Sequence, residues 1–140
     1  MLLTIHQSEL DALLALYNPR LNAIVSESAG LSARALLDRV TPMMADLAVD
    51  ILARETSVIT GMSKTQGKTH LNRAQEAVVD LILPEKIPVG READHHGVFE
   101  NLALGEAWGL LRLRVFRRRL RAALLARLRK ETKRMLQECT

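Results

Sequence analysis

Cysteine is almost absent from this sequence, which excludes two kinds of stabilisation. The one cysteine, Cys139, stands next to the last of the 140 residues. A single thiol cannot form an internal disulfide, and it cannot supply a site that needs several thiolates. We therefore expect no disulfide, no cysteine-based metal centre and a reducing compartment.

Aromatic residues are scarce as well. They make up 3% of the chain, whereas hydrophobic residues as a whole make up 48%. The core must therefore consist mainly of Leu, Ala, Val, Ile and Met. Sheets usually carry more aromatic and β-branched residues, and aliphatic cores suit helix-on-helix packing. The composition predicts a mainly helical fold, and the length predicts a single domain over residues 1–140.

Long apolar runs are also missing. No stretch approaches the ~20 apolar residues of a spanning helix. The segment Met1–Ile5 has no basic leader, and its apolar run is too short for a signal peptide. We expect neither secretion nor membrane insertion, and a cytoplasmic protein or a component of a soluble particle.

Charge is divided unevenly along the chain. The net charge is +4, but residues 111–140 hold eleven Arg or Lys and two Glu, which gives +9. Residues 1–110 hold nine Arg or Lys and fourteen Asp or Glu, which gives −5. A basic segment of this kind either binds an anionic partner or is neutralised by an acidic surface of its own chain or of a neighbour.

Apolar periodicity predicts helices through most of the body, residues 1–101. Ser8 and the acids after it predict a helix start, and Pro19 predicts its end, with a short second helix over residues 21–27. Ser32 is expected to cap the next helix. Pro42 marks a kink or a new start, and a helix is predicted from Pro42 to about Ser57.

The rest of the body is predicted to contain more loop. Residues 61–69 are polar with two glycines and are expected to form a flexible loop. Residues 71–82 fit a helix, but the apolar run at 78–83 also fits a strand, so a small β element around residues 78–101 stays open. Prolines and glycines in residues 84–97 predict a long connection, which is a candidate contact loop.

The last segment, residues 102–140, is predicted to form one long basic helix. Apolar residues recur at three- or four-residue spacing and form a stripe, which is a candidate interface for a partner: Leu113, Phe116, Leu120, Leu124 and Leu128. Thirty helical residues would reach about 45 Å, which is longer than a compact domain of this size is wide. We therefore expect part of the helix to project or to pack on another chain.

The same helix carries the candidate partner-binding cations, because like charges crowded on a helix are unfavourable unless anions offset them. Nucleic-acid phosphates, anionic lipid and acidic protein surfaces all qualify. The excess of Arg over Lys favours carboxylates, which bind guanidinium bidentately, and the lack of interleaved aromatics disfavours stacking on single strands. The candidates are Arg112, Arg114, Arg117, Arg118, Arg119, Arg121, Arg127, Arg129 and Lys130.

Motifs for catalysis or cofactors are incomplete. The glycines at 61 and 67 are separated by five residues, whereas a phosphate-binding loop needs four and a preceding strand. Asp94-His95-His96 could begin a metal site, but His6 and His70 lie in unrelated segments, and three or four ligands must converge. No serine stands in a nucleophile-elbow context. We expect no enzyme activity, no metal and no cofactor.

The order of the predicted parts resembles that of the tail-completion (neck) proteins of tailed bacteriophages. From about residue 32 onward, Pro42–Ser57 corresponds to their long helix, Thr60-Gly61 to a turn and residues 78–83 to a short strand region. Val98-Phe99-Glu100 through Gly105 corresponds to an aromatic–Glu–Gly signature, and the basic helix closes the chain. The resemblance implies a ring-forming, non-enzymatic virion component at the head–tail junction.

The sequence therefore predicts a structural or assembly protein. Its C-terminal helix would dock on other protein subunits, with a homo-oligomer in a larger assembly as the expected state. The alternative is a nucleic-acid-binding protein that uses the same helix on phosphates.

Overall fold

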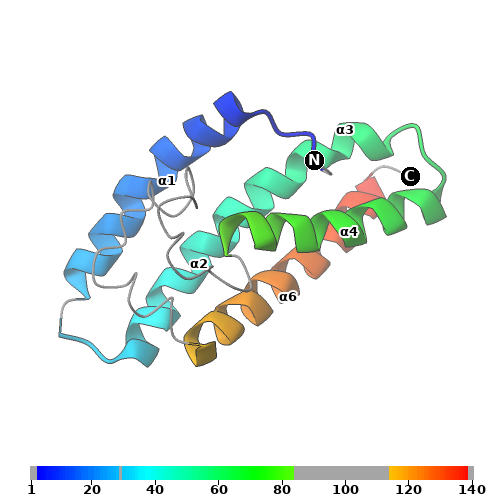
Figure 1. The fold of residues 1–140 in the computed structure, drawn as a ribbon. Helices are drawn as coiled ribbons and strands as arrows, with labels where there is room; N and C mark the ends of the chain where they lie inside the picture. The colour runs from blue at the N-terminus through cyan, green and yellow to red at the C-terminus, as the bar shows by residue number, and fades with distance from the viewer. Residues whose placement is uncertain (1–2, 29, 84–113, 139–140) are drawn as a thin grey trace.

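The computed structural model describes residues 3–28, 30–83 and 114–138, and their regular structure is helical throughout (Figure 1). The elements are α1 (Gln7–Glu27), α2 (Ala33–Leu52), the 3-10 helix η1 (Ala53–Glu55), α3 (Thr56–Ile59), α4 (Lys64–Ile82) and α6 (Arg114–Glu138). The predicted mainly helical fold is confirmed, as is the C-terminal helix from residue 114 onward.

The strand alternative is wrong for residues 78–82, which form the end of α4. The remainder of the proposed β element, at 84–101, lies outside the described residues, and so do the long connection and residues 102–113. None of the described helices combines the length and the apolar content that crossing a bilayer requires.

Helix α1 is continuous where the sequence predicted two helices. It begins at Gln7, one residue before the expected cap, and Pro19 lies inside it. The buried positions Leu14, Tyr17 and Leu21 keep helical spacing across the proline. The gain from burying this stripe outweighs the local cost of Pro19, because most helical stability in proteins comes from tertiary packing.

Helix α2 shows the same effect. The predicted cap is confirmed, since the Ser32 hydroxyl accepts a hydrogen bond from the Ala35 N–H. Pro42 lies within the helix, so the alternative of a new start there is wrong. The helix predicted to reach about Ser57 ends at Leu52, and η1 and α3 carry the chain on to Ile59.

The predicted flexible loop at residues 61–69 is mostly helix. Ser63 and Gln66 form a capping box, in which each side chain bonds the other's backbone N–H, and α4 begins at Lys64. This Ser-x-x-Gln pattern is a known helix-start signature, and the two glycines concealed it. Gly67 is buried in the first turns of α4, where an added Cβ would meet Leu136 and Ile59.

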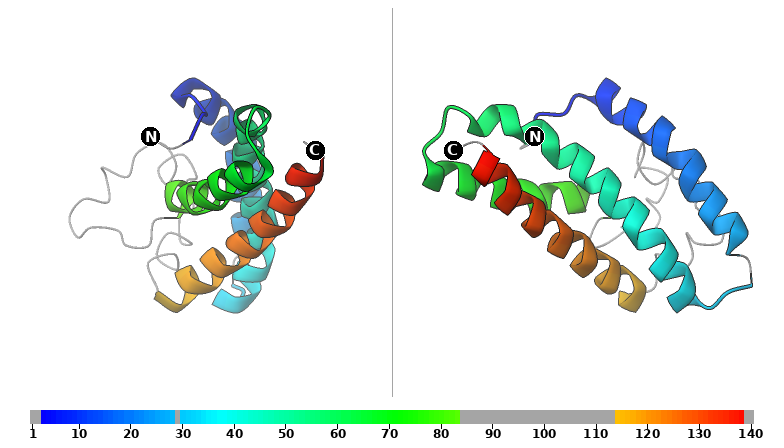
Figure 2. Two further views of the ribbon diagram at one scale, coloured as in Figure 1. Left: turned by 90° about the vertical axis from the view of Figure 1, so that its right-hand side faces the viewer. Right: turned by 180° about the vertical axis from the view of Figure 1, so that it is seen from behind.

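Helix α2 runs through the middle of the structure and contacts α1, α4 and α6 (Figure 2). Helix α1 lies along one side of α2, and α6 lies along the other side, where it also packs on α4. The core between the helices is aliphatic, as predicted, with Tyr17 the one buried aromatic side chain among the described residues.

Candidate functional site

The apolar stripe of α6 belongs to the core of this chain. Leu120, Leu124 and Leu128 have no exposed surface and pack with the buried residues of the other helices. In this fold they are covered without a partner subunit. Helix α6 lies along α2 and α4 over its length (Figure 1). The prediction that part of it would project assumed a rounder domain. Leu113 and the Phe116 side chain lie outside the described residues.

Apart from the buried Arg117, the basic side chains of α6 that the structure describes fall into two groups, and the first forms ion pairs within the chain. Arg121 lies 2.9 Å from the Asp80 carboxylate of α4 and donates to the Leu83 carbonyl oxygen at 2.6 Å. Arg127 lies 3.2 Å from the Asp46 carboxylate of α2. These two arginines therefore attach the edges of α6 to both neighbouring helices.

Arg134 is paired along α6 itself. Its guanidinium lies 2.8 Å from the carboxylate of Glu131 and 2.7 Å from that of Glu138. Hydrogen bonds to Glu131 and then to Glu138 raise the pKa of Arg134 above its ordinary value. The guanidinium is thus engaged with carboxylates of its own helix.

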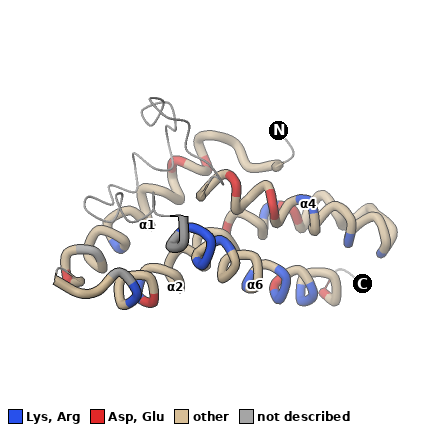
Figure 3. The backbone as a smooth tube through the Cα atoms, turned by 60° about the horizontal axis from the view of Figure 1, so that its bottom comes forward, with Lys and Arg blue, Asp and Glu red and all other residues tan. Residues whose placement is uncertain are grey.

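The second group faces solvent. It consists of five exposed cations that form no ion pair or side-chain hydrogen bond with the described residues: Arg118, Arg119, Arg129, Lys130 and Lys133. We call these five residues the α6 ridge. Figure 3 shows basic residues along nearly the whole of α6, whereas acidic residues are concentrated on the other helices.

Helical geometry places the α6 ridge on one side of the helix. At about 100° per residue, its members lie within roughly 60° of the direction opposite the leucine stripe, and Arg118 and Lys133 are about 22 Å apart along the axis. The exposed residues between them, Ala122 and Ala126, are small. A flat anionic surface can therefore approach all five cations together.

The remaining predicted partner residues are placed differently. Arg117 is buried on the core side of α6, so it does not belong to the ridge. The side chain of Arg114, at the first position of α6, and the whole of Arg112 lie outside what the structure describes. Lys133 was missing from the predicted set, although its spacing of four residues from Arg129 placed it on the same face.

A polar cluster around the buried Glu55 was not predicted at all. Glu55 has no exposed surface; it accepts hydrogen bonds from the Thr4 N–H and hydroxyl at 2.6 and 2.9 Å and lies 2.8 Å from Nε2 of His70. The cluster ties the segment before α1 to η1 and α4. No sequence pattern joins three residues so far apart, and we interpret the cluster as structural.

The other motif candidates do not form a cofactor site in the described residues. Residues 64–69 are helical, so they do not provide a loop of consecutive backbone amides around a phosphate. In the described ranges, no group of three or more His, Cys, Asp or Glu is arranged around a metal position. Asp94, His95 and His96 lie outside those ranges.

The α6 ridge is therefore the strongest candidate site. Five unpaired cations on a rigid helix attract an anionic surface, and their mutual repulsion falls when one binds. Comparison with protein-family models, curated protein sequences and solved structures gives no match to this chain.

Proposed function

We propose that this protein binds nucleic acid through its phosphate backbone, using the α6 ridge, and that it does so without catalysis. The observation that supports this most directly is the row of five exposed cations with no carboxylate partner in the part of the chain that the structure describes. Over its length of about 22 Å, a nucleic-acid strand in a duplex presents six or seven phosphates, so the charge densities are comparable.

The ion pairs within this chain weaken the case for a protein partner. The excess of Arg over Lys pointed to protein carboxylates, but three of those arginines already bind carboxylates of their own chain. Both lysines of α6 lie in the ridge. Among the residues that the structure describes, the exposed acids outside α6 that form no ion pair are spread over three helices: Asp11, Glu27, Asp38 and Glu76. Within residues 3–28, 30–83 and 114–138, they form no continuous acidic face to receive the ridge of an identical subunit.

A lipid surface fits the ridge less well than nucleic acid. Helices that lie on membranes insert an apolar face that is several residues wide. The apolar face of α6 is covered by α2 and α4, and only alanines are exposed between the ridge cations. The attraction that remains is electrostatic, and it favours a partner whose negative charges lie in a row, as the ridge cations do.

Salt dependence of binding tests the proposal. Five phosphate contacts predict a slope of about −4.5 for the logarithm of the association constant against the logarithm of salt concentration on duplex DNA. Replacing Arg129, Lys130 and Lys133 by Gln should reduce the magnitude of that slope by about 2.7. The assay is fluorescence anisotropy with nuclease-treated protein.

A matched control removes the same charge elsewhere. Arg20 of α1 and Lys68 and Arg73 of α4 are exposed and lie on other helices. Their triple replacement by Gln should leave the salt slope unchanged. Equal losses in the two triple variants would show that net charge, rather than the ridge, attracts nucleic acid, and would reject the proposal.

Assembly with other subunits is the second candidate. One observation favours it: the outer face of α1 is apolar, with Leu16 50% exposed beside Ala12, Ala15, Pro19 and Ala23. A ring-forming subunit of a head–tail junction would need such a contact surface. Mass photometry after nuclease treatment should then show a discrete oligomer that Leu16→Glu dissociates. A monomer that binds nucleic acid would reject the assembly role.

A further inference from the structure

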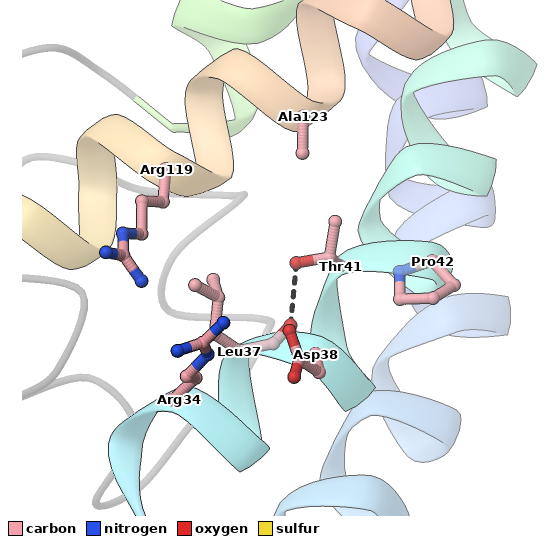
Figure 4. A pocket seen from close by; sticks show the side chains of 7 residues that line it. All are labelled: Arg34, Leu37, Asp38, Thr41, Pro42, Arg119 and Ala123. Carbon is pink, nitrogen blue, oxygen red and sulfur yellow. Dashed lines mark hydrogen bonds between the residues drawn. The ribbon is translucent and has the colours of Figure 1, made fainter.

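A groove opens between the first half of α2 and the first half of α6, beside the α6 ridge (Figure 4). Its volume is about 340 Å³. Arg34 and Asp38 stand on the α2 wall and Arg119 on the α6 wall. Arg119 is itself a ridge residue, so the groove continues the ridge onto a second helix.

The two arginines provide a place for one phosphate. Both are exposed, neither forms an ion pair with another described residue, and they extend into the groove from opposite walls (Figure 4). Guanidinium groups bind phosphate oxygens through paired N–H donors, which fixes the position of the phosphate as well as attracting it. A phosphate between Arg34 and Arg119 would be held from two sides.

Asp38 restricts which anion fits. Asp38 is exposed, lines the same groove and forms no ion pair within the described ranges. It repels a bare anion, so a well-bound ligand must bring a hydrogen-bond donor next to its negative charge. Nucleotides do so, because the N–H groups of the bases and, in RNA, the ribose 2′-hydroxyl belong to the same nucleotide as the phosphate.

The rest of the groove suits a base or a sugar. Leu37, Pro42 and Ala123 contribute its apolar surface. At about 340 Å³ the groove is near the lower limit of ligand pockets, which favours a single unstacked nucleotide over a base pair. In a duplex the donors on the Watson–Crick edges are also occupied.

We propose that this groove holds one nucleotide of a single-stranded nucleic acid. Its phosphate lies between Arg34 and Arg119, a donor of the same nucleotide binds Asp38, and neighbouring phosphates lie along the α6 ridge. The inference rests on the proposed function and deepens it, since it names single strands as the preferred ligand and gives the complex a fixed register.

Arg34→Ala tests the phosphate contact by anisotropy, with a single-stranded oligonucleotide and the duplex of the same sequence. We expect about tenfold weaker binding of the single strand, because a charge-assisted hydrogen bond is lost, and a much smaller change for the duplex. Arg39→Ala is the control, since Arg39 is an exposed arginine of α2 that does not line the groove. Equal effects of the two variants would overturn the proposal.

Asp38→Ala tests the proposal by the direction in which the affinity for the single strand changes. If Asp38 accepts a hydrogen bond from the nucleotide, single-strand affinity falls several-fold, although the protein becomes more positive. If the groove only attracts anions, affinity rises, which overturns the proposal. A fall with RNA alone assigns the donor to the ribose 2′-hydroxyl, and a fall with RNA and DNA assigns it to the base.

The two proposals fail in different ways. If the unmodified protein binds no nucleic acid in low salt, both are rejected. If it binds with the ridge-dependent salt slope while Asp38→Ala strengthens binding, the proposed function stands and the groove is not a nucleotide site. The substituted positions are exposed on helices, so circular dichroism should show native helix content in each variant.

Discussion

Gly67 provides a direct test of how α4 packs against its neighbours. It occupies the fourth position of the helix, is buried, and donates its N–H to the Ser63 carbonyl at 2.8 Å. A Cβ added there would lie 3.5 Å from Cδ2 of Leu136 and 3.6 Å from Cβ of Ile59. Both are ordinary van der Waals distances, so alanine fits without displacing either side chain.

Gly67→Ala should therefore stabilise the protein. In a helix interior, alanine is favoured over glycine by about 1 kcal/mol, largely because glycine loses more backbone freedom on folding. The new methyl group also becomes buried, which is worth up to about 0.8 kcal/mol. Because Gly67 is only the fourth residue of α4, the full preference of a helix interior does not apply, and we expect about 1 kcal/mol in total, or roughly 4 °C in Tm.

Urea denaturation followed by circular dichroism measures the change. Gly61→Ala is the control, because Gly61 precedes α4 and a Cβ there meets nothing within 4 Å; its effect should stay within about 0.5 kcal/mol. Gly67→Leu should destabilise by about 1–3 kcal/mol through overpacking. A loss of 1 kcal/mol or more in Gly67→Ala would refute the packing described for α4, α3 and α6.

Three further predictions concern other parts of the fold. Glu55→Ala should lower the free energy of unfolding by about 3 kcal/mol, since it removes a buried carboxylate that takes part in three partly buried hydrogen bonds, with the Thr4 N–H, the Thr4 hydroxyl and the His70 ring; Glu55→Gln should cost less in the same urea assay. Burial, and then the Asp50 carboxylate, raise the pKa of Tyr17, so its phenolate absorbance should appear at higher pH in the native than in the urea-unfolded chain. The contribution of Tyr17 to the free energy of unfolding should be fully present below about pH 10 and should be lost as pH rises above that value. Because the chain has one tyrosine, the absorbance reports on Tyr17 alone, and coincident titrations in the two states would contradict this. Lys133→Glu should raise the free energy of unfolding by a few tenths of a kcal/mol, because the new carboxylate pairs with Arg129 one turn earlier, and it should weaken nucleic-acid binding. A fall in both stability and binding would show instead that Lys133 has a structural role.

The fold class could be predicted because the relevant information is local. Ser32 caps α2 through its own hydroxyl, and the leucines of α6 repeat along a single helix. The predictions at Pro19 and Pro42 were wrong because proline disfavours a helix locally, whereas burial of the apolar face of the same helix favours its continuation. That burial depends on which helices become neighbours, which residue spacing alone does not specify.

The site could be predicted only in part for the same reason. The sequence identified α6 as the basic element, but it did not indicate which of its cations are paired. Arg127 meets Asp46 across 81 residues of sequence, and Arg121 meets the Leu83 carbonyl across 38. The groove joins Arg34 to Arg119 in the same manner. Each of these contacts follows from the packing of α6 between α2 and α4.

That packing also explains how one helix can carry so much positive charge. Residues 114–138 hold ten Arg or Lys and two Glu, a net +8. Repulsion between exposed like charges costs a few tenths of a kcal/mol per pair, whereas full burial of each of Leu120, Leu124 and Leu128 contributes about 2 kcal/mol. The core side therefore stabilises the helix well beyond the repulsion on its solvent side. Folding therefore does not require the ridge cations, which agrees with the proposal that they serve to bind an external anion.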